Sequence, residues 1–212
     1  MATIYDLKPR FQSLLRPLVG VLALAGVSAN AVTLAAAMLS IAYGAWLYGS
    51  GLAAVALWGL PIFLFIRMGL NAIDGMLARE HHQQSKIGAI FNELGDVISD
   101  VGLYLPFALL VGVWAPLVVM VVILGVMVEF VGVVAVQIGA TRRYDGPFGK
   151  SDRAVFFGIF AWVAASGIGL DPWGNWIMGA AIVASALTIF NRAKAALAEA
   201  GDTENTDGET KQ

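Results

Sequence analysis

Long apolar runs separated by short polar breaks dominate the sequence. Six of these runs have the length and apolar content typical of helices that cross a bilayer. We therefore predict spans at Ala31–Tyr48, Leu52–Ala78, Ile87–Val111, Pro116–Gly139, Ala154–Leu170 and Trp173–Phe190. Turn residues fill three of the breaks, at Gly49–Gly51, Gly112–Pro116 and Leu170–Asn175.

The two ends of the chain have different patterns. Residues 4–20 place apolar Ile4, Leu7, Phe11, Leu14, Leu15 and Leu18 at helical spacing among Lys8, Arg10 and Arg16. This pattern predicts an amphipathic helix lying on the membrane surface. Residues 199–212 are acidic and polar, which predicts a disordered tail. We thus expect one membrane domain over residues 1–198 and a tail over residues 199–212.

Composition agrees with a membrane protein. The chain is 58% hydrophobic and only 13% charged, whereas soluble domains are about 25% charged. There is no cysteine, which excludes disulfides and thiolate metal sites. The expected fold class is an all-α membrane protein with six transmembrane helices and an N-terminal interfacial amphipathic helix, with no nucleic-acid partner.

Basic residues indicate the orientation. Twelve of the 13 Lys and Arg residues fall on one side of the predicted spans, which the positive-inside rule makes cytoplasmic. We expect both termini and the active site on the cytoplasmic side of a bacterial-type inner (plasma) membrane. Arg67, inside the second span, is the exception. Its pairing with an acidic group is expected, because charges within a membrane usually have a partner.

Polar residues cluster where the second span ends and the third begins. A helix turns about 100° per residue, so Asn71 and Asp74 share one face of the second span. Asn92, Glu93, Asp96 and Asp100 lie within an arc of about 100° on the third. Such oxygen ligands suit hard divalent cations. The candidate metal ligands are Asn71, Asp74, Asn92, Glu93, Asp96 and Asp100.

The cluster is also compatible with two roles that need no catalytic metal. Buried Asp and Asn side chains can bond one helix to another without any ligand. The acidic pocket could also hold a cation in a transporter or binding protein. Three neighbouring carboxylates repel one another unless they are neutralised, which favours a metal site over simple helix bonding.

The same segment resembles the signature of the CDP-alcohol phosphotransferase family, D-x2-D-G-x2-A-R-x8-G-x3-D-x3-D. The aligned residues are Asn71, Asp74, Gly75, Ala78, Arg79, Gly88, Asn92 and Asp96. Six of the eight signature positions match, and the spacing is kept. Ser28-Ala29-Asn30-x-x-Thr33 also resembles the family's T-P-N-x-x-T segment, which enters the first span.

This resemblance implies an activity and a set of roles. A CDP-linked lipid such as CDP-diacylglycerol would transfer its phosphatidyl group to a hydroxyl acceptor and release CMP, in phospholipid biosynthesis. One or two Mg²⁺ or Mn²⁺ ions would hold the diphosphate, and Asp96 would act as general base. The predicted donor-binding residues are Asn30, Thr33, Asn71, Gly75, Ala78 and Arg79. A homodimer among membrane lipids is the implied assembly.

Two signature aspartates are replaced, by Asn71 and Asn92. An amide oxygen can coordinate a hard cation but supplies no charge. We therefore hypothesise a rearranged metal site using Asp74, Asp96 and either Glu93 or Asp100. A single-metal site and a catalytically degenerate relative that only binds the CDP-lipid are the alternatives.

The loop from Thr141 to Arg153 carries four cations among glycine and proline residues. This composition favours a pocket for an anion, such as the phosphate of a polyol-phosphate acceptor. Arg143, Lys150 and Arg153 are the predicted acceptor-binding residues. Topology alone predicts the same cations on a cytoplasmic loop, so both interpretations stay open. The acceptor is an alcohol or a polyol phosphate, and the sequence does not choose between them.

Overall fold

Helices account for nearly all regular structure in the computed structural model, which describes residues 4–209, with side chains described for residues 9–201. In chain order the elements are α1 (Ile4–Leu24), α2 (Ala29–Gly49), α3 (Ala54–Glu80), α4 (Lys86–Tyr104), the 3₁₀ helix η1 (Leu105–Leu109), α5 (Ala115–Gln137), α6 (Lys150–Ala165) and α7 (Trp173–Glu209). No strand occurs among these residues, which confirms the predicted all-α class.

In the part of the chain that the structure describes, four helices are long and apolar enough to cross a membrane: α2, α3, α5 and α7 as far as Gly201. They carry large apolar side chains on their exposed surfaces, including Leu34, Phe65, Phe130 and Val183. Apolar surface of this extent is costly in water and is suited to lipid. The chain is therefore a membrane protein.

The other two predicted spans are shorter than expected. The helix over Ile87–Val111 stops at Tyr104 and continues as η1, because Pro106 lacks the N–H group that an α-helix needs. The helix over Ala154–Leu170 ends at Ala165, before a turn in which Gly167 has a φ of +74°. The count of six spans stays a prediction.

The described chain divides into two compact units. The first unit is Met1–Trp46 with Ile62–Leu103, and the second is Leu47–Pro61 with Tyr104–Gln212. The divisions fall within α2 and α3 and before the last residue of α4, so the signature segment lies in the first unit and the basic loop in the second.

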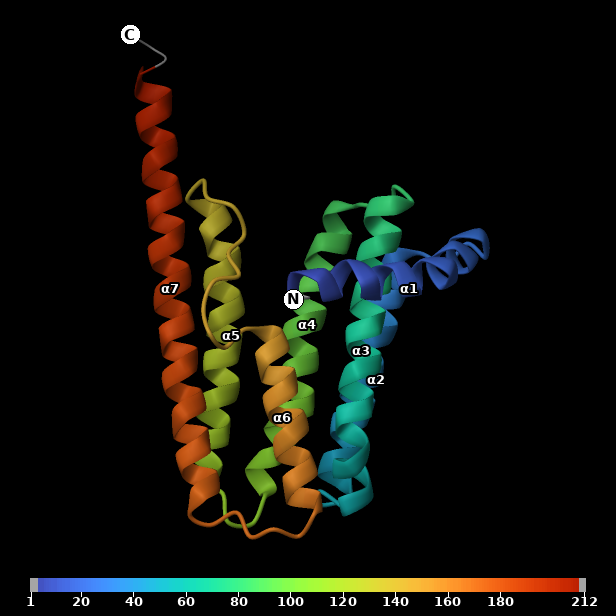
Figure 1. Cartoon of the computed structure of the whole chain (residues 1–212), viewed down its shortest axis with the longest axis vertical. Helices are drawn as coiled ribbons and strands as arrows, with labels where there is room; N and C mark the ends of the chain where they lie inside the picture. The colour runs from blue at the N-terminus through green and yellow to red at the C-terminus, as the bar shows by residue number, and fades with distance from the viewer. Residues whose placement is uncertain (1–3, 210–212) are drawn as a thin grey trace. The chain divides into compact units, whose positions relative to one another are not determined.

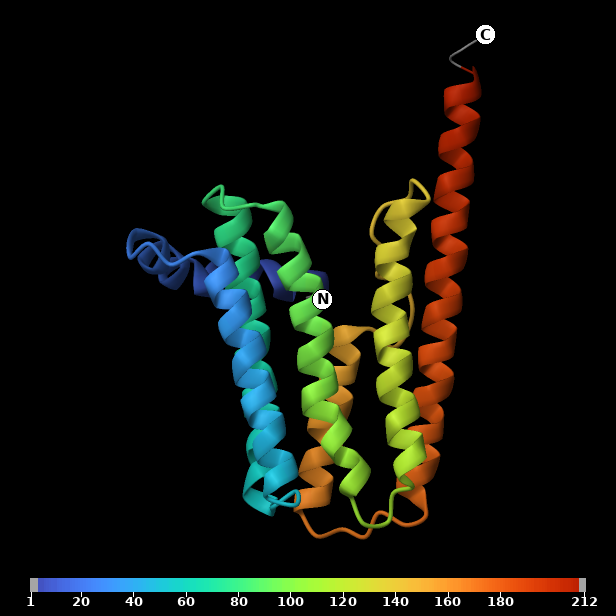
Figure 2. The ribbon, with the colours of Figure 1, turned by 180° about the vertical axis from the view of Figure 1, so that it is seen from behind.

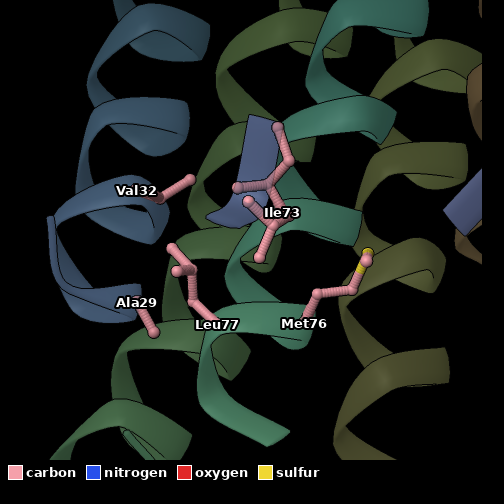
Figure 3. Packing of buried hydrophobic residues seen from close by; sticks show 6 residues of the cluster. Ala29, Val32, Ile73, Met76 and Leu77 are labelled. Carbon is pink, nitrogen blue, oxygen red and sulfur yellow. The ribbon is translucent and has the colours of Figure 1, made fainter. Parts of the chain in front are cut away.

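In the first unit, α1 runs crosswise to α2 and α3 (Figure 1). Buried Val19 of α1 packs in one apolar cluster with Ala29 and Val32 of α2 and Ile73 and Leu77 of α3. Figure 3 shows Ala29 and Val32 pointing toward Ile73 and Leu77. This packing fixes the start of α2 beside the end of α3, where the signature residues lie.

The N-terminal segment forms the helix α1, whose side chains are described from Pro9 onward, and its position on the membrane surface stays a prediction. Leu14 and Leu18 are exposed on it, as expected for a helix with one face in the lipid interface. The apolar and basic residues predicted at 4–8 lie outside the described side chains.

In the second unit, α5 and α7 lie side by side along their length (Figures 1 and 2). An aromatic cluster surrounds the start of η1, where the rings of Tyr104 and Phe157 stack with centroids 4.1 Å apart. Phe107 packs edge-on against Phe157 at 5.1 Å. These contacts hold α6 against the end of α4 and η1.

The helix α7 continues into the acidic stretch for which disorder is predicted. Glu199, the first residue of that stretch, accepts hydrogen bonds from the backbone N–H and the hydroxyl of Thr141, both at 3.0 Å. These hydrogen bonds connect α7 to the loop that follows α5. Residues 210–212 lie outside the described part, and the domain boundary at residue 198 with a disordered tail over residues 199–212 stays a prediction.

Replacing Gly44 by alanine tests how closely α2 and α4 pack. A Cβ atom at Gly44 would collide with the backbone carbonyl of Gly102. We expect Gly44→Ala to lower the free energy of unfolding by about 1–3 kcal/mol, because a backbone cannot move aside cheaply. Thermal unfolding in detergent measures this. Gly49→Ala, in the same helix with open space around it, is the control, and equal stability of the two variants would contradict the packing.

Candidate functional site

A cavity of about 550 Å³ lies in the first unit. The beginning of α2, the end of α3, the loop after α3 and the beginning of α4 form its wall. The lining residues are Ala29, Asn30, Thr33, Asp74, Gly75, Ala78, Arg79, Gln83, Gln84, Ser85, Lys86, Gly88, Ala89 and Asn92. Five of the six predicted donor-binding residues are among them, and the sixth, Asn71, is not.

Two signature glycines make room for polar side chains at this cavity. The Arg79 guanidinium lies over Gly75, where a Cβ atom would come within 3.0 Å of its Nη2 atom. At Gly88, a Cβ atom would come within 2.5 Å of the Asn30 amide oxygen. Because Gly75 has no side chain, the Arg79 guanidinium can lie against it, and a cation is placed at the cavity wall.

Asp74 is buried, with 4% of its surface exposed, although it lines the cavity. Thr33 donates a hydrogen bond from its hydroxyl to Asp74 Oδ2 at 2.8 Å. The same hydroxyl is 3.1 Å from the backbone carbonyl oxygen of Ala29. Thr33 thus orients the Asp74 carboxylate, a positioning role beyond the donor contact that the sequence predicts.

A second polar group, next to Asp74 along α3, links α3 to α4. Asn71 donates from its amide to Asp96 Oδ1 at 3.2 Å. Arg67 donates to Asp100 Oδ1 at 2.7 Å and to the backbone carbonyl of Asp96 at 3.2 Å, and its Nη2 is 3.7 Å from Asp96 Oδ1. The expected ion pair of Arg67 is present, with Asp100 as its closest acidic partner.

These contacts bear on the predicted metal ligands. Among the described residues, no three His, Cys, Asp or Glu side chains are grouped so that they could hold a metal ion. Asp74 and Asn92 line the cavity, whereas Glu93, Asp96 and Asp100 do not. Asp100 forms a buried ion pair with Arg67. This contact links α3 to α4 without a metal ion. The metal site over Asn71, Asp74, Asn92, Glu93, Asp96 and Asp100 stays a prediction.

Gln83 is a cavity residue that sequence reasoning missed. Its amide oxygen accepts from the Ala29 N–H at 2.7 Å, and its amide nitrogen donates to the Val27 carbonyl at 3.4 Å. The loop after α3 is thereby tied to the turn before α2. His82, with a φ of +55°, lies in the turn that precedes Gln83. A single glutamine in a loop has no periodic pattern around it, so the sequence offers no reason to single it out.

An ion pair next to the cavity connects α1 to α3. Arg16 donates from Nε and Nη2 to the two carboxylate oxygens of Glu80, each at 3.0 Å. This hydrogen bonding raises the pKa of the Arg16 guanidinium above its ordinary value. Because Glu80 follows Arg79, the pair fastens α1 beside the cavity wall.

The predicted acceptor-binding residues lie in the second unit. Arg143 donates to both carboxylate oxygens of Asp145, at 2.8 and 3.0 Å, and also to Glu199. Its hydrogen bonding lowers the pKa of the Asp145 carboxyl below its ordinary value. Arg153 is buried and donates to Glu129 at 3.0 Å. Lys150 is the half-buried first residue of α6.

Asp100→Asn separates a structural role from a metal-binding role. Removing one partner of a buried ion pair costs about 3–5 kcal/mol, because the other charge stays buried. We expect Asp100→Asn to lower the unfolding temperature clearly, while Asp171→Asn, in an exposed turn, leaves it unchanged. Thermal unfolding with and without Mn²⁺ measures both. Wild-type stability combined with lost Mn²⁺ binding would instead make Asp100 a metal ligand.

Comparison with known proteins agrees with this site. The model of the CDP-alcohol phosphatidyltransferase family matches residues 26–189. The Escherichia coli (strain K12) protein named inner membrane protein YnbA is 46% identical over 195 residues, which are 92% of this chain and 96% of that protein.

Solved structures of Mycobacterium tuberculosis phosphatidylinositol phosphate synthase (PgsA1) share the fold. The complex with manganese and citrate has a TM-score of 0.70 and 19% identity, over 85% of this chain and 88% of that one. The form with CDP-DAG bound has a TM-score of 0.65 and 16% identity, over 87% and 92%. The matched region contains every signature residue, and the chain belongs to the CDP-alcohol phosphatidyltransferase family of enzymes.

Proposed function

We propose that the protein transfers a phosphatidyl group from a CDP-linked lipid, such as CDP-diacylglycerol, to the hydroxyl of an acceptor and releases CMP. Family membership supports phosphatidyl transfer in phospholipid synthesis. The observation that carries the proposal is the cavity of the first unit, which gathers Asn30, Thr33, Asp74 and Arg79 from segments far apart in sequence.

The cavity suits a nucleotide diphosphate. Arg79 and Lys86 supply positive charge along its wall, and guanidinium groups bind phosphate oxygens in pairs. Asn30 and Gln84 can exchange hydrogen bonds with a base or a ribose. A related structure contains CDP-DAG, which supports the same ligand here. Asn71, which bonds Asp96 and does not line the cavity, acts through that aspartate.

The residues present fit a divalent cation in donor type. Asp74 offers a carboxylate and Asn92 an amide oxygen at the cavity, and Mg²⁺ commonly takes one or two carboxylates together with substrate phosphates. A related structure contains manganese. We propose that Asp74, Asn92 and Asp96 hold one or two Mg²⁺ or Mn²⁺ ions. When bound, the ion neutralises charge on the diphosphate.

Asp96 is the proposed general base. It is half-buried, and the Asn71 amide fixes one of its carboxylate oxygens. The proton of the acceptor hydroxyl passes to Asp96 as the oxygen forms a bond to the phosphorus that carries the lipid. The bond from that phosphorus to the bridging oxygen breaks, and CMP leaves with the electron pair. Arg79 is placed to stabilise charge on the departing phosphate.

The acceptor is proposed to be an alcohol or a polyol phosphate, contacted by Arg143, Lys150 and Arg153. Both arginines already hold carboxylates of the chain itself, Asp145 with Glu199 and Glu129 respectively. A phosphate-bearing acceptor would have to compete with these groups.

The membrane arrangement follows from the same reasoning. We propose that α4 and α6 complete six spans, with both termini and the cavity on the cytoplasmic side and the chain assembled as a homodimer. The Escherichia coli relative is named an inner membrane protein, which supports an inner-membrane location. The concentration of cations in the loops on one side supports the orientation.

A relative that binds the CDP-lipid without catalysis is the second candidate. The lack of a three-carboxylate group among the described residues favours it, and so do Asn71 and Asn92. Retention of Asp74, Arg79 and Asp96 at signature positions favours the enzyme.

Release of CMP tests the proposal. Purified protein with CDP-diacylglycerol, Mg²⁺ or Mn²⁺ and a panel of alcohols and polyol phosphates is expected to release CMP, and EDTA should abolish the release. Asp96→Asn should lower kcat at least about 100-fold, the usual contribution of a general base. Asp171→Asn, in an exposed turn, is the control. Binding of CDP-diacylglycerol without CMP release under any condition would support the non-catalytic candidate.

A further inference from the structure

Three arginines of the second unit converge on one carboxylate, that of Glu129 in α5. Arg142 donates to Oε2 at 2.9 Å, Arg153 to Oε1 at 3.0 Å and Arg192 to Oε2 at 3.3 Å. The three come from the loop after α5, from α6 and from α7. Both oxygens of Glu129 are thus engaged by guanidinium groups that approach from different elements.

The cluster is buried, and α5 is shaped to receive it. Arg153 and Arg192 are each 2% exposed and Glu129 is 6% exposed. Gly125 and Gly132 flank Glu129 along α5, and a Cβ atom there would come within 3.2 Å of Arg153 Cδ or 2.6 Å of Arg142 Nη1. Glycine at these positions therefore leaves space that the arginine side chains fill.

Three guanidinium groups around a small anion form a site suited to phosphate. Arginine offers planar pairs of donors that match phosphate oxygens, and several together match the charge of a phosphate monoester. The anion held there in this chain is its own Glu129 carboxylate. A phosphate entering the cluster would meet that carboxylate in the same space, and two anions so close together repel strongly.

We propose that Glu129 is a specificity-determining residue that fills the arginine cluster from within and excludes acceptors carrying a phosphate monoester. The acceptor of the transfer reaction is then an unphosphorylated alcohol. This inference rests on the proposed function, in which Arg153 contacts the acceptor. In this arrangement the negative charge of Glu129 repels a phosphorylated acceptor and leaves an unphosphorylated alcohol unaffected, so a repulsive group sets the specificity.

Phosphate binding tests the inference without any catalysis. Glu129→Ala removes the carboxylate, so inorganic phosphate at millimolar concentration should raise the unfolding temperature of this variant in phospholipid-free detergent, relative to chloride at equal ionic strength. Wild type should show no such shift. Asp145→Asn is the matched control, since it also removes one carboxylate from an arginine, Arg143, but leaves Glu129 in place.

If Glu129→Ala does not fold, Glu129→Gln is measured instead, with the same expectation. Stabilisation of wild type and the Glu129 variant by phosphate to the same extent would overturn the inference. So would the absence of phosphate stabilisation in the folded variant.

The acceptor panel gives the second test. Wild type should form lipid product with unphosphorylated alcohols, and Glu129→Ala should gain at least about tenfold in kcat/KM for polyol phosphates relative to the matching alcohols. Preference of the wild type for a polyol phosphate would overturn the inference. If no acceptor releases CMP, the proposed function fails, while the phosphate-binding measurement still decides whether Glu129 blocks an anion site.

Discussion

Charged side chains within apolar helices are stable only where an opposite charge or a hydrogen-bond partner meets them. The buried arginines obey this constraint. Arg67 pairs with Asp100 in the first unit, and Arg153 and Arg192 pair with Glu129 in the second. These pairings hold helices together. They also distinguish the charged side chains that pair between helices from those that line the cavity.

The charged groups at the cavity wall include the Asp74 carboxylate and the Arg79 guanidinium. Asp74 is oriented by the Thr33 hydroxyl, and Arg79 lies over Gly75. A carboxylate and a guanidinium that line the same cavity can bind a cation and a phosphate together. Two links outside the signature, Gln83 to the start of α2 and Arg16 to Glu80, hold the neighbouring segments in place.

The family resemblance predicted Asn30, Thr33, Asp74, Gly75 and Arg79 as site residues, and all five line one cavity. Helical periodicity placed Asn92, Glu93, Asp96 and Asp100 on one arc of α4, and of these only Asn92 lines the cavity. Periodicity does not predict which side chain of a neighbouring helix a given residue contacts. The pairing of Asp100 with Arg67 and the contacts of Gln83 are therefore seen only in the three-dimensional structure.

Glu129 shows the same limit over a longer range. Its partners lie 13, 24 and 63 residues further along the chain, so no local pattern links them. Glycines on either side of a buried acid were the available signal.

The most direct test of the cavity as a nucleotide site is CDP binding to the purified protein by calorimetry, with Mn²⁺ and with EDTA. We predict binding that requires Mn²⁺ and is lost in Asp74→Asn, and equal binding in EDTA or in this variant would contradict a metal-held diphosphate at this cavity.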